Sequence, residues 1–133
     1  MKISEISKQV GLSVSSIRYY SDLGLIPSMT RDSEGERIFD NEAITWLQGI
    51  KFLRELGLTI SEIRSYQELC QKSGPAAVKK RHAMLLKQYQ KAQAELTDST
   101  ERLTLLKAKI QTEEAIIAGK KNDSLSPARR FSQ

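Results

Sequence analysis

The chain has 133 residues and a mass of 15.0 kDa, with 39% hydrophobic and 28% charged residues, which fits one compact domain with an extension. It contains no apolar run near the roughly 20 residues of a membrane-spanning helix, and no secretory signal opens it, so we expect a cytoplasmic protein without a membrane partner. Its one cysteine, Cys70, excludes an intramolecular disulfide and an all-cysteine metal pair, and we expect neither a metal nor a cofactor.

The net charge of +5 is unevenly distributed along the chain. Residues 1–74 contain nine Lys and Arg against ten Asp and Glu, whereas residues 75–133 contain twelve against six. Any nucleic-acid binding by the N-terminal part must therefore depend on a few well-placed cations rather than on a strongly basic surface.

Glycines separate short amphipathic segments in residues 1–74, and this spacing predicts four short helices and one hairpin. Ser4 can open the first helix, and Gly11 supplies the positive φ that often follows a helix end. Ser13 can cap the second helix only two residues later. The chain therefore begins with a helix, a tight turn and a second helix.

A hairpin, or wing, is predicted after the second helix. Gly24 ends that helix, and Pro27 cannot continue it, so the chain becomes extended toward Thr30. Residues 31–35 are polar and rich in turn formers, and residues 37–39 resume a pattern that favours a strand.

Two further helices follow the wing. Asp40 can cap the third helix, whose period leaves open whether Phe52 or its neighbours face the core. Gly57 ends the third helix. Thr59 and Glu62 have the spacing of a capping box and open the fourth helix.

A long helix is predicted from Ala76 to Ala118, because this stretch contains neither Gly nor Pro, and Gly119 ends it. A helix of this length extends roughly 60 Å at 1.5 Å per residue and cannot bury its own apolar seam. No second long helix exists in the chain, so we expect a homodimer held by a coiled coil. The seam residues are Val78, Leu85, Tyr89, Leu96, Leu103, Leu106, Ile110 and Ile117.

Three parts result from this pattern. We expect a DNA-binding domain over residues 1–74, a dimerisation helix over 75–119 and a disordered tail over 120–133, because the tail is polar and without period. The fold class is mainly α, with a winged helix-turn-helix domain and a small β-hairpin.

The second predicted helix presents side chains that suit DNA recognition. Its apolar residues face inward, so the opposite face can enter a major groove while wing arginines grip the flanking backbone. The alternative is that these side chains only decorate and pack a small helical domain, since helix-turn-helix units also occur without a DNA role. The DNA-binding candidates are Ser15, Ser16, Arg18, Tyr19, Arg31 and Arg37.

Six successive motifs, in order from residue 3 to about residue 73, resemble the landmarks of the MerR family of bacterial transcription regulators. The block with Arg18 and the Gly-Leu-Ile-Pro that follows it are the most specific of these. The motifs are Ile3-Ser4-Glu5-Ile6-Ser7, Gly11-Leu12-Ser13-Val14, Ile17-Arg18-Tyr19-Tyr20, Gly24-Leu25-Ile26-Pro27, Gly35-Glu36-Arg37-Ile38-Phe39 and Phe52-Leu53-Arg54-Glu55-Leu56-Gly57-Leu58.

The resemblance implies a homodimer, with its long helices antiparallel, on a pseudo-palindromic site in double-stranded promoter DNA. It further implies that the dimer bends and untwists this DNA so that RNA polymerase can engage both promoter elements. Tyr20 matches the second tyrosine of the recognition block, where a phosphate contact and half-buried packing are both open. At Glu36 and Phe39 the wing departs from the family pattern of an aromatic and a tyrosine, which weakens the implied wing contacts.

The signal that such a regulator answers is less defined. Metal-sensing relatives carry further cysteines near the end of the long helix, which this chain lacks, and drug-sensing relatives append a domain for which the fourteen residues after Gly119 leave no room. The layout is more similar to the aldehyde and electrophile-stress branch, although Phe52 fills the place of its reactive cysteine. Cys70 is a possible sensor, because Lys72 and Arg64 nearby would favour its thiolate, or it packs as a small apolar residue against the core.

We therefore predict a sequence-specific transcription regulator that responds to a stress or small-molecule signal. The alternative is a coiled-coil architectural or interaction module that binds DNA or protein without effector-driven activation. An enzyme is not expected, because the sequence has no glycine-rich phosphate loop, no nucleophile with a base at a recognised spacing and a single histidine.

Overall fold

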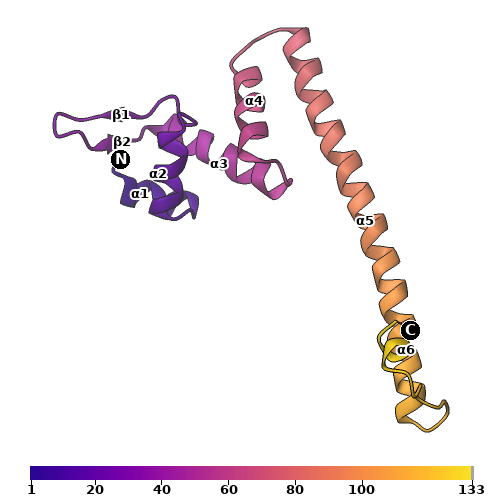
Figure 1. The fold of residues 1–133 in the computed structure, drawn as a ribbon. Helices are drawn as coiled ribbons and strands as arrows, with labels where there is room; N and C mark the ends of the chain where they lie inside the picture. The colour runs from indigo at the N-terminus through magenta and orange to yellow at the C-terminus, as the bar shows by residue number, and fades with distance from the viewer. Residues whose placement is uncertain (133) are drawn as a thin grey trace. The chain divides into compact units, whose positions relative to one another are not determined.

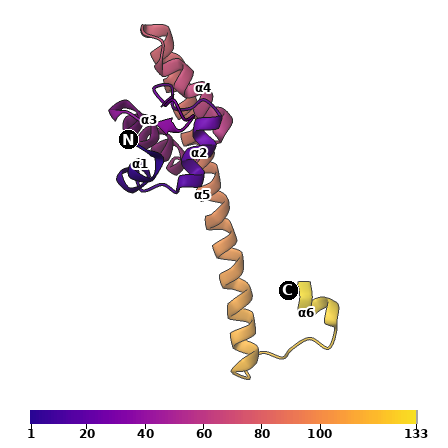
Figure 2. The ribbon, with the colours of Figure 1, turned by 90° about the vertical axis from the view of Figure 1, so that its left-hand side faces the viewer.

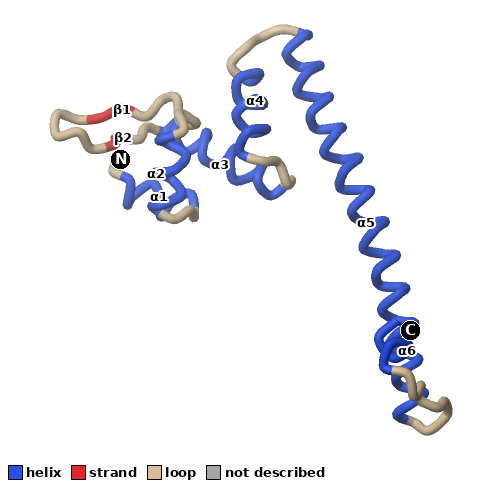
Figure 3. The backbone as a smooth tube through the Cα atoms, in the orientation of Figure 1, coloured by secondary structure: helices blue, strands red, loops and turns tan. Residues whose placement is uncertain are grey.

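The computed structural model describes residues 1–132. This part of the chain is mainly helical, with one antiparallel hairpin, as the sequence predicts (Figures 1 and 3). In chain order the elements are α1 (Ile3–Val10), α2 (Val14–Asp22), β1 (Thr30–Arg31), β2 (Arg37–Ile38), α3 (Asn41–Glu55), α4 (Ile60–Cys70), α5 (Pro75–Ile117) and α6 (Pro127–Ser132).

The chain divides into two compact units, and the boundary lies inside α5. The first unit is Met1–Gln88, and the second begins at Tyr89. The predicted boundary at residue 74 lies instead just before α5, where Gly74 has a φ of 105°.

The turn between α1 and α2 is the tight glycine turn that the sequence predicts. Gly11 lies in the left-handed region with a φ of 70°, and the side chain of Ser13 accepts a hydrogen bond from the Ser16 backbone N–H. Ser7 Oγ also donates to the carbonyl of Leu12 at 2.6 Å, which closes the turn. The helix α1 begins at Ile3 rather than at Ser4, with Lys2 as an N-cap that makes no side-chain capping bond.

The wing is short. Thr30 pairs with Ile38 and Arg31 with Arg37, and the segment before Thr30 is a turn rather than a strand. The turn between the strands is organised by Asp32, whose Oδ1 accepts the backbone N–H groups of Glu34 and Glu36, each at 2.9 Å.

The hydrophobic core joins α1, α2, α3, α4 and the base of the wing, and Figure 2 shows the first three of these helices gathered together. The ambiguous period of α3 resolves in favour of Ile50 and Leu53, because Phe52 is 58% exposed. Burial of each large apolar side chain stabilises the fold by about 1.5–3 kcal/mol. The core residues are Ile6, Val10, Ile17, Leu25, Ile26, Phe39, Ala43, Leu47, Ile50, Leu53, Leu58 and Ile63.

Capping side chains set the starts of α3 and α4. The Asp40 carboxylate accepts the Ala43 N–H at 2.9 Å and a hydrogen bond from Ser28 Oγ at 2.7 Å. The hydrogen bond from Ser28, followed by that from the Ala43 backbone, holds the pKa of Asp40 below its ordinary value. Thr59 and Glu62 form both hydrogen bonds of the predicted capping box.

The beginning of α5 contacts the turn between α3 and α4. Gln88 Nε2 donates to the carbonyl of Leu56 at 2.8 Å, which satisfies a carbonyl at the end of α3. Gly57 has a φ of 90°, a backbone conformation that favours glycine, and a Cβ there would lie 2.6 Å from the same Gln88 nitrogen, so the Gln88 side chain would have to move.

In the second unit, the tail contains a short helix where the sequence has no period and predicts disorder. Pro127 starts α6 in a position that suits its missing N–H, and Ser126 Oγ accepts the Arg129 N–H at 3.4 Å. Lys109 Nζ on α5 donates to the carbonyl of Arg130 at 2.9 Å. None of the helices among residues 1–132 has the length and hydropathy required to span a bilayer.

Candidate nucleic-acid interface

The helix α2 has one face in the core and one face in solvent. Ile17 is fully buried and Ser21 nearly so, whereas Ser15, Arg18 and Tyr19 are exposed. The spacing of Ile17 and Ser21 places both on one side of the helix, so the DNA candidates project from the other. The structure thus leaves the predicted recognition face free for a ligand.

A group of hydroxyls lies at the N-terminus of α2. Ser13 Oγ donates to Ser16 Oγ at 2.8 Å and lies 3.1 Å from Ser15 Oγ. Helix N-termini carry a partial positive charge and unpaired N–H groups, which together attract phosphate. The predicted Ser15 and Ser16 contacts are therefore chemically suited to DNA backbone.

The two tyrosines of the recognition block differ in environment. Tyr19 is 53% exposed, while Tyr20 is half-buried and packs against the hydrophobic core. Their ring centroids lie 5.8 Å apart in a tilted arrangement. The packing interpretation of Tyr20 is confirmed, and its phosphate contact stays a prediction.

A hollow lies between the start of α1, the helix α2 and the wing. It brings together Arg18 from α2, Arg31 from β1 and Arg37 from β2, which the sequence places up to 19 positions apart. Lys2 and Glu36 also line it. Three of the predicted DNA-binding cations thus surround one concave surface.

The three arginines are not equivalent. Arg18 is exposed, and none of the ion pairs found within residues 1–132 includes it. Arg31 Nη1 donates to the carbonyl of Gly35 at 2.7 Å, a neutral partner that leaves the guanidinium charge uncompensated. Both are available to neutralise phosphate.

Arg37 is instead held by α2. Its Nη2 lies 2.5 Å from Asp22 Oδ1, its Nε donates to Ser21 Oγ at 3.2 Å, and its side chain is only 18% exposed. The sequence predicts that Arg37 grips the DNA backbone from the wing, whereas the structure pairs its guanidinium with the carboxylate of Asp22.

A second ion cluster joins the chain start to the wing turn and was not predicted. Lys2 Nζ lies 2.7 Å from Asp32 Oδ2 and 2.8 Å from Glu36 Oε2. The hydrogen bonds to Asp32 and then Glu36 raise the pKa of Lys2, and the hydrogen bond from Lys2 lowers the pKa of Asp32. Sequence patterns could not find this cluster, because it forms only when the wing folds back onto the residues before α1.

Cys70 lies at the end of α4 and is exposed, so its interpretation as a core residue is wrong. Arg81 Nη1 lies 3.7 Å from Cys70 Sγ, which places a cation beside the thiol. The cations expected there were Lys72 and Arg64, but Arg64 Nη2 donates to the carbonyl of Leu23 at 2.7 Å. Within residues 1–132 no three His, Cys, Asp or Glu side chains are grouped closely enough to hold a metal ion.

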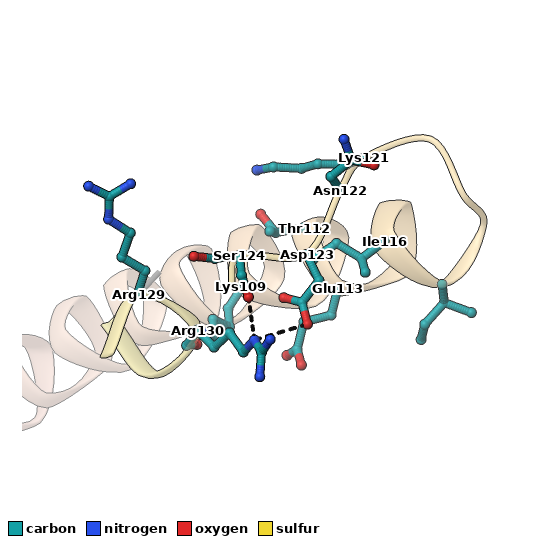
Figure 4. A pocket seen from close by; sticks show the side chains of 11 residues that line it. Lys109, Thr112, Glu113, Ile116, Lys121, Asn122, Asp123, Ser124, Arg129 and Arg130 are labelled. Atoms are coloured by element: carbon teal, nitrogen blue, oxygen red, sulfur yellow. Dashed lines mark hydrogen bonds and ion pairs between the residues drawn. The ribbon is translucent and has the colours of Figure 1, made fainter. Parts of the chain in front are cut away.

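The second unit contains a hollow of its own, between the end of α5 and α6 (Figure 4). Arg130 lies across it, with its Nε 3.2 Å from Asp123 Oδ2 and hydrogen bonded to the carbonyl of Ser124. Neither cysteine nor histidine is among its lining residues, so it offers oxygen and cationic nitrogen groups rather than ligands for soft metals.

The predicted dimerisation seam is uncovered in the single chain. Leu96 is 69% exposed and Leu103 66%, values that isolated core-forming leucines do not have. Two exposed leucines of α5, Leu86 and Leu105, were not included in the predicted seam. The predicted residues that are more than half exposed are Val78, Tyr89, Leu96, Leu103, Leu106, Ile110 and Ile117.

Known proteins are similar to this chain in sequence and in fold. Residues 1–69 match the model of the MerR HTH family of regulatory proteins. The HTH-type transcriptional regulator AdhR of Bacillus subtilis (strain 168) is 41% identical over 69 residues, which make up 52% of this chain and 49% of AdhR. The chain thus spans about half the length of this curated relative.

Two solved structures extend the similarity of fold into the long helix. A Listeria monocytogenes protein assigned to the MerR family of transcriptional regulators is 29% identical, with a TM-score of 0.67 over 90% of this chain and 89% of that one. HiNmlR, a MerR family regulator lacking the sensor domain and bound to promoter DNA, is 23% identical, with a TM-score of 0.65 over 89% of each chain.

Proposed function

Because the chain belongs to the MerR family of helix-turn-helix regulatory proteins, we propose that it is a sequence-specific transcription regulator that binds promoter DNA as a homodimer and distorts it. The observation that carries this proposal is the hollow beside α2, which is lined by Arg18 and Arg31, because neither arginine belongs to an ion pair found within residues 1–132. One face of α2 is anchored by Ile17, so the other is rigidly presented to a major groove.

The contacts divide by purpose. Arg18 and Tyr19 read base edges or adjacent sugar from the exposed face of α2, and Arg31 neutralises phosphate from the wing. The hydroxyls of Ser15 and Ser16, together with the N-terminus of α2, bind backbone phosphate.

The dimer supplies two such surfaces at a fixed separation. The exposed seam of α5 supports this assembly, because a stripe of apolar side chains on one 43-residue helix is covered only when a partner helix packs on it. Bending a site of 20–30 base pairs costs about 1–6 kcal/mol, which contacts at both half-sites can offset. The distorted promoter elements would then be presented to RNA polymerase. We place the regulator in the cytoplasm, where bacterial promoter DNA and RNA polymerase are found.

We infer that Cys70 is the residue through which a stress signal reaches this regulator. Its exposure gives electrophiles access, and the guanidinium of Arg81 lies 3.7 Å from its sulfur. Arg81 lies on α5 and Cys70 ends α4, so modification of the thiol would break a contact between the two helices.

Footprinting of the purified protein on its own upstream DNA tests the main proposal. We expect protection of one pseudo-palindromic segment, with enhanced cleavage at its centre where the duplex is bent. The Arg18→Ala variant serves as the matched negative control. A uniform loss of cleavage along the whole fragment would instead indicate the architectural alternative, in which DNA is bound without sequence selection.

A further inference from the structure

The wing turn contains three acidic residues, which are unfavourable on a surface that binds phosphate. Asp32, Glu34 and Glu36 lie within five residues of its turn, and Glu36 lines the same hollow as Arg18 and Arg31. A carboxylate at this position would repel the DNA backbone that the two arginines attract.

Lys2 compensates two of these three charges. Its Nζ lies 2.7 Å from Asp32 Oδ2 and 2.8 Å from Glu36 Oε2, so one ammonium bridges both carboxylates. The other oxygen of Asp32 accepts the backbone N–H groups of Glu34 and Glu36. The Glu36 carboxylate is thereby drawn toward the residues before α1.

The backbone around Lys2 is fixed on both sides. Met1 exchanges two backbone hydrogen bonds with Phe39, at 2.6 and 2.8 Å, and the Lys2 carbonyl accepts the N–H groups of Glu5 and Ile6. A side chain with an anchored backbone loses less conformational freedom when it makes an ion pair, so this bridge is better organised than most exposed pairs.

We propose that Lys2 is a positioning residue of the DNA interface, which holds the acidic wing turn in place and keeps its carboxylates from opposing the DNA contacts of Arg18 and Arg31. The inference rests on the proposed DNA-binding function. It assigns Lys2 an action through Glu36 and Asp32 rather than a contact with DNA.

A double-mutant cycle on the full chain tests this assignment. The proteins are the wild type, Lys2→Met, Glu36→Gln and the double variant, each with any affinity tag at the C-terminus so that Met1 and Lys2 are undisturbed. The dissociation constant for the footprinted promoter duplex is measured for each protein at several salt concentrations. Thermal unfolding and amide hydrogen exchange of the wing are measured without DNA.

We expect Lys2→Met to weaken promoter binding about fivefold, as two exposed pairs of ordinary strength would give, with little change in melting temperature. Glu36→Gln should change binding less than twofold in the wild type but recover most of the loss in the Lys2→Met background. The Glu36 N–H, which donates to Asp32, should exchange faster in Lys2→Met.

A Lys2 that contacts phosphate directly would give a different result. Glu36→Gln would then bring no recovery, and the slope of log affinity against log salt would fall by about 0.9 for each chain of the dimer, or about 1.8 in all, in both Lys2→Met proteins. Equal gains from Glu36→Gln in both backgrounds would also overturn the proposal. If the wild type binds promoter and scrambled duplexes equally, the proposed function is contradicted independently of Lys2. In that case the role of Lys2 is tested without DNA, and an unchanged rate of amide hydrogen exchange in the wing of Lys2→Met would overturn it.

Discussion

The guanidinium of Arg37 on β2 lies 2.5 Å from the carboxylate of Asp22 at the end of α2, so the wing is joined to the helix that we assign to the major groove. Ser21 Oγ accepts a further hydrogen bond from the same side chain. In the proposed complex α2 and the wing contact the duplex together. We therefore expect the Arg37–Asp22 pair and the hydrogen bond to Ser21 to fix the orientation of the wing relative to α2.

The Asp22→Asn variant tests whether Arg37 positions the wing or binds DNA. A positioning role predicts that the loss of the pair weakens promoter binding by up to about fivefold, because such surface ion pairs contribute about 0.2–1 kcal/mol. A phosphate contact predicts the opposite sign, because the substitution would free Arg37 and remove a negative charge. Asp98→Asn, an exposed acid of α5, controls for the change in net charge.

Arg18→Ala should greatly reduce discrimination between promoter and scrambled duplexes while leaving the dimer intact. A side chain that pairs with a base edge contributes about 1–3 kcal/mol to discrimination, or roughly ten- to a hundredfold in affinity. Arg102→Ala removes an exposed arginine of α5 and serves as the matched control. Unchanged selectivity in Arg18→Ala would remove α2 from the role of recognition helix.

Leu103→Asp should give monomers and weaken DNA binding with them, because a carboxylate in the seam would be buried without a partner. Leu103 is 66% exposed in the single chain, so the monomer itself should remain folded. Ala108→Asp adds the same charge on the side of α5 away from Leu106 and Ile110, and should remain dimeric. Size-exclusion chromatography with light scattering of both variants decides the question, and a dimeric Leu103→Asp would refute the proposed seam.

Acid should destabilise the first unit through Asp32 and Asp40. Each has a folded-state pKa below its ordinary value of 3.8, the first through Lys2 and the second through Ser28, so the ionised forms stabilise the fold. Their contribution is complete above the unfolded pKa and is lost as pH falls below about 4. Urea unfolding between pH 7 and pH 3 should show a shallower acid decline for Asp40→Asn, which keeps a capping side chain, than for the wild type. Parallel declines would contradict this account.

Cys70→Ser should abolish any change that an alkylating aldehyde causes in the promoter footprint. The expected cause is loss of the contact between the thiol and Arg81. Arg81→Met is the companion variant, because it removes the contact with the thiol while keeping the cysteine, and it should by itself cause part of the same change in the footprint. An aldehyde response that survives in Cys70→Ser would exclude this cysteine as the sensor.

Local signals account for the parts of the fold that the sequence predicts well. Gly11, Ser13 and Asp40 each act within three or four residues, through a positive φ or a capping bond, and the structure has all three as expected. The period of α3 was less decisive, because spacings of three and four admit Phe52 as well as Leu53 on the inner face.

Long-range pairing explains what the sequence did not predict. Lys2 meets Asp32 and Glu36 from 30 and 34 positions away, and Arg37 meets Asp22 from 15. Sequence periodicity carries no information on such contacts, because they depend on how the wing packs against α2 and the residues before α1. The sequence therefore predicts the elements that carry the candidate site, while the partners of its charged residues are visible only in three dimensions.

The most direct test of the central claim is fluorescence anisotropy of the wild-type protein with a labelled promoter duplex and a scrambled duplex of equal length, with stoichiometry measured on the same samples. We predict two chains per promoter duplex, at least about a thousandfold preference for the promoter sequence, and an affinity that falls steadily with added salt. Equal affinity for both duplexes, or one chain bound per promoter site, would contradict the account.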